Sequence, residues 1–269
     1  MTSLGHSTVD GDRSSELSRL QQFWTERYRD GSLSESGWLG AGELHNTLVY
    51  RCKAQALRGA LRDCGVDRAT SFSVLDAGCG QGFFADVYER DYPRCAYTGV
   101  DLAAAALERV CGRHPRFHFH VADISSWRGL RDEPFDIIQS FEVLHLFLDD
   151  RLVEHTLRNL AGQLKRSGAM LVTAVLPRET TTPNRYSRHL ARRVFLALVD
   201  RAGLRVERER PMYFWLPDGG PSNRYLRFAV SRFGLPGLYA ADRLALALRV
   251  PRMFRTGSDS AMKLLTLRK

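Results

Sequence analysis

A glycine-rich turn of seven residues has the types and spacing to bind a ligand: Asp76-Ala77-Gly78-Cys79-Gly80-Gln81-Gly82. An apolar run precedes it and an aromatic pair follows it, so the pattern predicts a buried strand that turns sharply into a helix. Glycine tolerates the positive φ angles that such a turn needs, and its missing Cβ lets a ligand lie against the backbone. The free N–H groups that open the helix favour an anionic group on that ligand.

The spacing of the glycines and the acid before them separate this turn from a dinucleotide-binding turn. The glycines follow G-x-G-x-G, whereas the dinucleotide fingerprint is G-x-G-x-x-G. Asp76 would face the pyrophosphate of a dinucleotide, while its carboxylate can accept hydrogen bonds from a cationic or N–H-bearing ligand. Asp101 ends the next apolar stretch about 20 residues further on, where an acid binds ribose hydroxyls. The pattern therefore favours an amino acid joined to a nucleoside.

A third acid, Asp123, ends the stretch that follows, so acids stand at the carboxyl ends of three successive predicted strands. In a parallel α/β sheet these ends form the edge at which ligands bind. Apolar runs predict strands over residues 72–75, 95–100, 117–121, 135–140, 169–175, 204–214 and 261–267. Helical spacing predicts helices over residues 16–28, 44–64, 149–166 and 189–202.

With these elements in order, residues 72–177 resemble a class I S-adenosylmethionine-dependent methyltransferase. The resemblance rests on the glycine turn, on Val100-Asp101-Leu102, on Val121-Ala122-Asp123-Ile124 and on the fourth strand with Phe141-Glu142-Val143-Leu144-His145. It implies an α/β fold, a Rossmann-like doubly wound sheet of seven strands that is mostly parallel with an antiparallel last strand. This chain adds N-terminal helices and a helical insertion before the last strand.

The resemblance also implies a methyl donor, S-adenosylmethionine, which leaves as S-adenosylhomocysteine. The residues that would wrap this donor are Gly78, Cys79 and Gly80. Asp76 would lie near the methionine amino group, and Ser140 beside the methionine part. Asp101 would hold the ribose.

At the adenine end, the resemblance places Leu102 against the ring and Asp123 with Ile124 at its edge. At the other end, Tyr28 and Arg51 from the N-terminal helices can close on the methionine part of the donor. The alternative is that Tyr28 and Arg51 are only packing and surface residues.

The chain divides into a tail, a cap and a catalytic domain. These are a disordered tail at 1–14, a helical cap at 15–70 and a methyltransferase domain at 71–269 with an insertion at 217–257. The insertion shows two helical patterns, near residues 223–233 and 238–250. With 269 residues and 44% hydrophobic content, the chain can bury one full core.

Methyl transfer from a sulfonium needs alignment of acceptor, methyl and sulfur, an effect that can be worth about 7–11 kcal/mol. A hydroxyl acceptor also gains from a positioned base. His145 is the candidate base, because it follows the fourth strand and imidazole titrates near neutrality. His45 and Glu142 are weaker candidates. Alternatively, His145 caps or packs the turn in which it lies.

Metal and hydrolase chemistry find less support. His118 and His120 alternate with phenylalanines and would share one face of a strand, but no further ligand completes a metal set at suitable spacing. We therefore expect a structural pair and no metal. The chain also lacks the G-x-S-x-G elbow of serine hydrolases.

The acceptor class is the least constrained part of the prediction. The segment Ser140-Phe141-Glu142-Val143 replaces the Asn/Asp-Pro-Pro-aromatic motif of enzymes that methylate base amino groups, which disfavours a nucleic acid. We expect O-methylation of a small molecule, such as a specialised metabolite or a sugar. A carboxyl or a carrier-bound acceptor stays open, and so do a NAD-dependent oxidoreductase and a non-catalytic cofactor-binding protein.

Cysteines and charge give weaker indications of compartment and partners. Five cysteines without C-x-x-C spacing, no membrane-length apolar run and no secretory signal predict a cytoplasmic protein with reduced thiols. Residues 178–269 carry a net charge of +12, against −3 for the rest of the chain. This excess can attract an acidic acceptor, an acyl-carrier protein, a membrane surface or nucleic acid, or it is simply a solvated arginine surface. The oligomeric state stays open.

Overall fold

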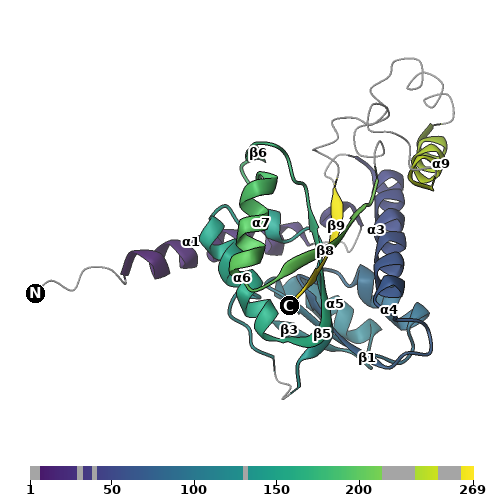
Figure 1. Cartoon of the computed structure of the whole chain (residues 1–269), viewed down its shortest axis with the longest axis horizontal. Coiled ribbons are helices and arrows are strands. Elements are labelled where there is room, and N and C mark those ends of the chain that lie inside the picture. Colours follow the sequence, from purple (N-terminus) through teal and green to yellow (C-terminus); the bar gives the residue numbers. More distant parts are fainter. Residues whose placement is uncertain (1–6, 29–32, 38–40, 130–132, 214–233, 248–261) are drawn as a thin grey trace, which may run out of the picture.

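The computed structural model describes the chain except for residues 1–6, 29–32, 38–40, 130–132, 214–233 and 248–261 (Figure 1). Its centre is a seven-stranded sheet with the order β3-β2-β1-β4-β5-β9-β8. The strands are β1 Phe72–Ala77, β2 Cys95–Asp101, β3 His118–Val121, β4 Phe135–Ser140, β5 Leu164–Ala174, β8 Arg205–Pro211 and β9 Lys263–Arg268. All seven predicted strands are present, and β9 alone runs antiparallel to its neighbours, which confirms the predicted fold class.

Helices cover both faces of the sheet (Figure 1). They are α1 Ser7–Arg27, α2 Leu33–Ser36, α3 Glu43–Asp63, α4 Phe83–Asp91, α5 Ala104–Arg113, the 3-10 turn η1 Leu144–Leu146, α6 Asp150–Gly162, α7 Arg192–Arg201 and α9 Gly234–Ala247. Successive residues of β1 point to opposite faces, so Val74 joins a core with α3 and α4, and Leu75 joins one with α6 and α7. Burial on both faces explains the continuous apolar runs of the central strands.

The register of the central strands brings the acids to one edge. Asp76 lies beside Gly99 of β2 and Gln139 of β4. Asp101 ends β2 two residues beyond Gly99 and pairs with Val121 of β3. Asp123 comes two residues after the end of β3. The parallel pairing therefore gathers the three acids at the carboxyl ends of the strands, as the sequence predicts.

Several predicted boundaries are wrong. α1 already begins at Ser7, inside the stretch predicted to be a disordered tail, because a helix once formed extends at little further cost. α6 ends at Gly162 rather than at residue 166, since Leu164 begins β5 by pairing with Phe135. α7 begins at Arg192 rather than near His189.

A short hairpin, β6 Thr181–Asn184 with β7 Ser187–His189, occupies the place where helix was predicted to begin. Threonines and Pro183 in β6 disfavour a helix and suit an extended edge. α9 matches the helical pattern near 238–250. The other pattern of the insertion, near 223–233, lies outside the described residues.

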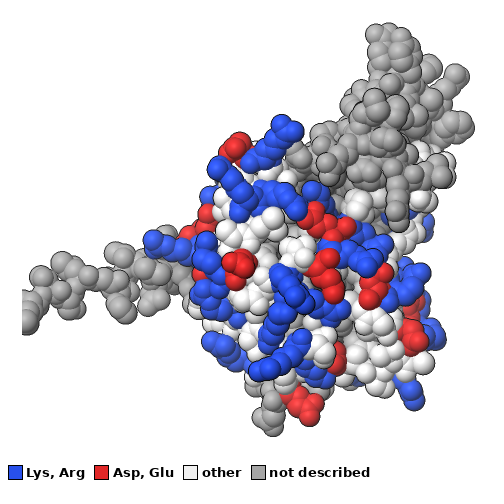
Figure 2. Space-filling model, viewed as in Figure 1, with Lys and Arg blue, Asp and Glu red and all other residues white. Residues whose placement is uncertain are grey.

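Several basic side chains of the last third form ion pairs where the structure describes them. Lys and Arg side chains spread over the face that carries α7 and β8, with acids between them (Figure 2). Within the last third of the chain, Arg192 pairs with Glu209, and Arg268 pairs with Glu207. These pairs favour a solvated arginine surface. Among the helices that the structure describes, none has the length and apolar character to cross a membrane.

Candidate functional site

The glycine turn lies tightly between β2 and η1. The N–H groups of Gly78 and Cys79 both donate to the Val100 carbonyl, at 2.7 and 3.1 Å. Gly78 has a φ of 88°, and a Cβ there would overlap the Val143 side chain. No other residue fits this position, because both the backbone angle and the space exclude a side chain. The turn therefore presents bare backbone to the space above it.

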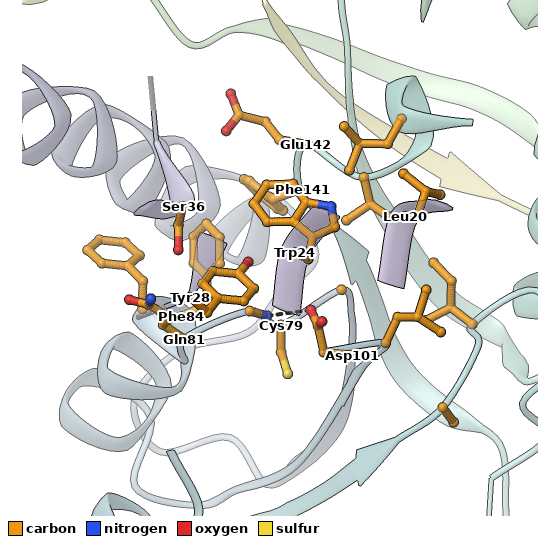
Figure 3. A pocket seen from close by; sticks show the side chains of 18 of the residues that line it. Leu20, Trp24, Tyr28, Ser36, Cys79, Gln81, Phe84, Asp101, Phe141 and Glu142 are labelled. Atoms are coloured by element: carbon orange, nitrogen blue, oxygen red, sulfur yellow. Dashed lines mark hydrogen bonds between the residues drawn. The ribbon is translucent and has the colours of Figure 1, made fainter. Parts of the chain in front are cut away.

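That space is a cavity with about 1110 Å³ of empty volume, part of it continuous with solvent (Figure 3). Pockets of this size accept a nucleoside joined to an amino acid. Eight of the residues predicted to bind the donor line it: Tyr28, Gly78, Cys79, Gly80, Asp101, Leu102, Asp123 and Ile124. The described structure thus brings most of the predicted site together, while the role of each residue stays a prediction.

Asp101 is fixed in place by the backbone around it. One carboxylate oxygen accepts the Gly80 N–H at 2.8 Å, and the other accepts the Ala103 N–H at 2.9 Å. Burial raises the pKa of Asp101, although these N–H groups counter the shift. Each oxygen keeps a second lone pair, so the carboxylate can also accept hydrogen bonds from a pair of hydroxyls. This geometry suits ribose.

Asp123 also serves the turn in which it lies. Its carboxylate accepts hydrogen bonds from the Ser125 N–H at 2.8 Å and from the Ser126 hydroxyl at 3.1 Å. Ile124 is buried beside it, and Leu102 faces the same part of the cavity. An apolar wall with an acid at its rim suits a flat, hydrogen-bonding ring such as adenine.

Tyr28 directly follows α1 and lies in the cavity close to Asp101. Its hydroxyl lies 3.0 Å from where a Cβ of Gly80 would stand. Burial raises the pKa of Tyr28 well above its usual value, and the charge of Asp101 adds to the shift. Its ring stacks on Trp24 with centroids 5.2 Å apart. α1 therefore lays two aromatic rings over the glycine turn (Figure 3).

Three predicted donor residues do not line the cavity. Asp76 is 1% exposed and lies beneath the turn, where the Tyr97 hydroxyl donates to it at 2.6 Å. Burial raises its pKa to about 6. Ser140 is fully buried and donates to the Ala77 carbonyl at 2.9 Å, which ties β4 to β1. Arg51 is exposed on α3.

The predicted base is also outside the cavity lining. His145 lies in η1, and its ring meets the His189 ring edge-on with centroids 5.9 Å apart. Burial lowers its pKa to about 4, which leaves a weak proton acceptor. His45 is buried on α3 and does not line the cavity either. His118 and His120 stand on β3, and no group of three metal-binding side chains occurs among the described residues.

The cavity is also lined by a buried ion pair, which the sequence did not reveal. Lys53 of α3 is 1% exposed, and its ammonium pairs with the Glu142 carboxylate. The ammonium also lies 3.9 Å from the centre of the Tyr50 ring. Burial lowers the pKa of Lys53, but Glu142 and Tyr50 outweigh it, so the net pKa is raised. Lys53 is therefore a permanent cation inside the cavity.

Helical spacing carried a signal for Lys53. It lies three residues after Tyr50 and four before Leu57, which are both buried, so it shares their face. Arg51 shares its face with Gln55, which is exposed. The polar character of lysine concealed that signal, because such side chains are rarely buried.

The chain is similar to known methyltransferases in sequence. Residues 74–168 match the family described as a methyltransferase domain. A probable S-adenosylmethionine-dependent methyltransferase of Mycolicibacterium smegmatis is 28% identical over 73% of this chain and 70% of that protein. A second one, from Mycobacterium tuberculosis, is 32% identical over 44% of this chain. The matched part covers only 38% of that protein.

Solved structures show the same fold. An S-adenosylmethionine-dependent methyltransferase of Leishmania major superposes with a TM-score of 0.64 at 12% identity, over 94% of this chain and 83% of that one. Magnesium protoporphyrin IX methyltransferase of Synechocystis, solved with S-adenosylhomocysteine, gives 0.58 at 11% identity over 94% and 99%. The fold, the glycine turn and the family match agree that residues 74–168 form a methyltransferase domain, and the similar proteins support S-adenosylmethionine as its methyl donor.

Proposed function

We propose that this enzyme transfers the donor's methyl group to an oxygen atom of a small molecule, such as a specialised metabolite or a sugar. One observation carries the proposal, namely the apolar enclosure of the cavity. Leu17 and Leu20 of α1 line it together with Leu146 and Phe147, which belong to the same apolar cluster. A cavity with such apolar walls admits a small acceptor more readily than a polymer.

The charges of the cavity support a cationic donor. Its lining contains four acids and two bases: Asp86, Asp101, Asp123, Glu142, Lys53 and Arg113. Aromatic faces add to this attraction, since rings such as Phe141 and Trp24 stabilise a cation near them. S-adenosylmethionine brings a sulfonium to this surrounding.

Transfer to oxygen then mainly needs alignment. The acceptor oxygen forms a bond to the methyl carbon while the carbon–sulfur bond breaks and its electron pair stays on sulfur. The acceptor proton leaves to a base or to water. His145 remains the candidate base of the sequence analysis, although its low pKa and its place outside the cavity give it little support.

A carrier-bound acceptor is the second candidate. A relative from Paenibacillus, named malonyl-[acyl-carrier protein] O-methyltransferase, is 24% identical over 51% of this chain and 51% of its own. The basic last third of this chain suits an acidic carrier protein. All five cysteines are free thiols, which supports the further proposal of a cytoplasmic location.

The acceptor is tested by a transfer assay with labelled S-adenosylmethionine and a panel of sugars, phenols, carboxylic acids and loaded carrier proteins. Label that enters a hydroxyl compound in an alkali-stable form supports the proposal. Alkali-labile label, as in a methyl ester, points to a carboxyl acceptor, and label on the carrier to the second candidate. Label on nitrogen or carbon contradicts O-methylation.

Asp101→Ala tests the donor site itself. Two hydrogen bonds from hydroxyls to a carboxylate are lost, so we expect the affinity for S-adenosylhomocysteine to fall about tenfold to a hundredfold. Calorimetry measures this change, and thermal unfolding without ligand checks that the fold survives. Glu108→Ala removes an exposed acid of α5 and serves as the control. Equal affinities for Asp101→Ala and the control would refute the ribose assignment.

A further inference from the structure

We propose that Lys53 and Glu142 hold the two charged ends of the donor's amino acid, with Lys53 on its carboxylate and Glu142 on its ammonium. The inference rests on the proposed methyl transfer from S-adenosylmethionine and assigns a part of that same site. It replaces the sequence expectation in which Asp76 and Arg51 meet the methionine end.

Lys53 has a positive charge and an unused N–H donor with which it can bind a carboxylate. An ammonium has three N–H donors. Among the described residues, its contacts are the Glu142 carboxylate and the face of the Tyr50 ring. One donor therefore remains for an oxygen in the cavity that Lys53 lines. Because the side chain is almost fully buried, its cation gains much more from such an oxygen than an exposed lysine would.

Glu142 is directed into the cavity by an unusual backbone. Its φ is 58°, and among the described residues no other residue besides glycine has a positive φ. The Glu142 N–H donates to the Thr173 hydroxyl at 2.6 Å, which fixes this conformation. Strain of this kind persists where the surroundings impose it, and it clusters at binding sites. The strained backbone keeps a carboxylate beside Lys53.

The pair lies where the amino-acid end of the donor must lie. In the view of Figure 3, Glu142 lies on one side of the Trp24 ring and Asp101 on the other. If Asp101 holds the ribose, the amino acid extends away from it along the glycine turn. Val143, next to Glu142, packs over Gly78 of that turn. The far end of the donor therefore meets the ion pair.

Charge balance favours an amino acid over a simple anion. A second carboxylate alone would leave the pair with an excess of negative charge in a partly dry cavity, which is costly. An amino acid brings an ammonium with its carboxylate, so each charge of the pair gains an opposite partner. The residues expected from the sequence lack this geometry, since Asp76 is sealed beneath the turn and Arg51 faces solvent.

The test compares S-adenosylhomocysteine with 5′-methylthioadenosine, which shares the thioadenosine part but has no amino acid. Calorimetry gives both affinities for the full-length enzyme and for Lys53→Met, Glu142→Gln and the double variant. We expect each single variant to lose about tenfold to a hundredfold in affinity for S-adenosylhomocysteine and to change less than about threefold for 5′-methylthioadenosine. Retained 5′-methylthioadenosine binding shows that the rest of the site is folded.

A single variant leaves one charge buried alone and can unfold for that reason. The double variant removes both charges, so no single charge is left buried alone. We expect it to bind the two ligands with nearly equal affinity. Arg51→Met changes the other basic residue on the same helix and should keep the wild-type preference for S-adenosylhomocysteine.

The proposal is overturned if the double variant keeps that preference, or if Arg51→Met loses it. A drop in turnover with an unchanged preference for S-adenosylhomocysteine over 5′-methylthioadenosine would indicate that the ion pair contacts the acceptor. That result would also overturn the proposal. The affinity measurements need no acceptor, so a failure of O-methylation in the labelled-methyl assay would leave the proposed roles of Lys53 and Glu142 intact. Wild-type enzyme that binds neither ligand would instead refute the donor site as a whole.

Discussion

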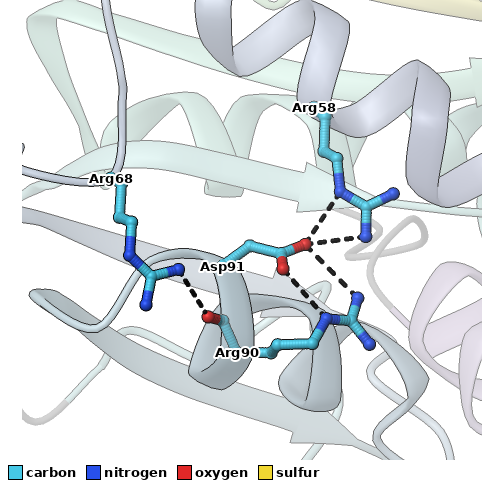
Figure 4. Close-up of polar contacts among 4 residues, drawn as sticks. All are labelled: Arg58, Arg68, Arg90 and Asp91. Carbon is cyan, nitrogen blue, oxygen red and sulfur yellow. Dashed lines mark hydrogen bonds and ion pairs between the residues drawn. The ribbon is translucent and has the colours of Figure 1, made fainter.

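Two ion-pair clusters of this enzyme use the same side-chain chemistry in opposite surroundings. On the outside, Asp91 of α4 accepts from Arg58 of α3 at 2.8 Å and from Arg90 at 2.9 Å (Figure 4). The Arg90 side chain is 62% exposed. In the cavity, Lys53 pairs with Glu142 while only 2% of the lysine side chain is exposed. The first cluster joins two helices at the partly exposed surface, and the second is held inside the cavity.

The difference shows where charge is kept for binding rather than for stability. An exposed pair gains little, because water solvates the separated ions nearly as well, and its median value is about 0–1 kcal/mol. Burying a pair costs several kcal/mol of desolvation per ion, which an apolar replacement would avoid. A buried pair on a strained backbone is therefore better explained by a ligand than by the fold.

The largest effect on stability is expected from Asp76, a buried acid whose described partners are neutral. Burial raises its pKa to about 6, although hydrogen bonds from Tyr97 and Gln139 oppose the shift. The folded state thus binds the proton more tightly than the unfolded state, whose pKa is about 3.9. The resulting stability is fully present below about pH 4 and is lost as the pH rises through about 6.

Asp76→Asn should remove this slope. Relative to the variant, the wild type should lose about 2 kcal/mol in free energy of unfolding between pH 4 and pH 7. Denaturant unfolding across this range measures both proteins. If the free energies of unfolding of the two proteins change in parallel with pH, burial does not raise the pKa of Asp76. The contrast between buried and exposed acids would then weaken.

A smaller effect is expected from His145, which is close to the cavity but not in its lining. With a pKa of about 4, it is already neutral at physiological pH and holds a proton weakly. We expect His145→Ala to lower turnover less than about tenfold, whereas loss of a general base costs about 10²–10⁴-fold. The assay uses the acceptor found with labelled donor. A hundredfold loss, with an acidic limb in the wild-type pH profile that the variant lacks, would restore His145 as the base.

The smallest effect is expected at the exposed cluster. Asp91→Asn removes the shared partner of Arg58 and Arg90 and should cost less than about 1 kcal/mol in free energy of unfolding. In 1 M salt the difference should shrink, since exposed charges are screened within about 3 Å. Thermal or denaturant unfolding at two salt concentrations measures it. A cost above about 2 kcal/mol that salt does not reduce would erase the contrast between the two clusters.

The sheet and the edge of the site were predictable because both depend on strong local patterns. Strands buried on both faces leave apolar runs, and the acids that follow β2 and β3 must meet at the carboxyl edge. Asp101 was found in this way. The methionine end was not, because it depends on how α3 rotates over the sheet. Two residues along a helix turn the side chain by about 200°, which separates Arg51 in solvent from Lys53 in the cavity.

Asp76 and Ser140 show a second limit of the sequence. Both follow the family pattern, yet neither reaches the cavity, because Asp76 bonds to Tyr97 and Ser140 bonds to the Ala77 carbonyl. Which polar groups satisfy each other inside the sheet depends on contacts between distant residues. The left-handed backbone of Glu142 is equally invisible in sequence, since glutamate rarely adopts it.

We infer that one cavity holds the whole donor, from the ribose at Asp101 to the amino acid at Lys53 and Glu142. A crystal structure of the enzyme with S-adenosylhomocysteine tests it most directly. We predict the ribose hydroxyls on the Asp101 carboxylate, the ligand carboxylate on the Lys53 ammonium and the ligand ammonium on Glu142. Density that places the amino acid beside Arg51 or leaves the Lys53–Glu142 pair without a ligand contact would contradict the account.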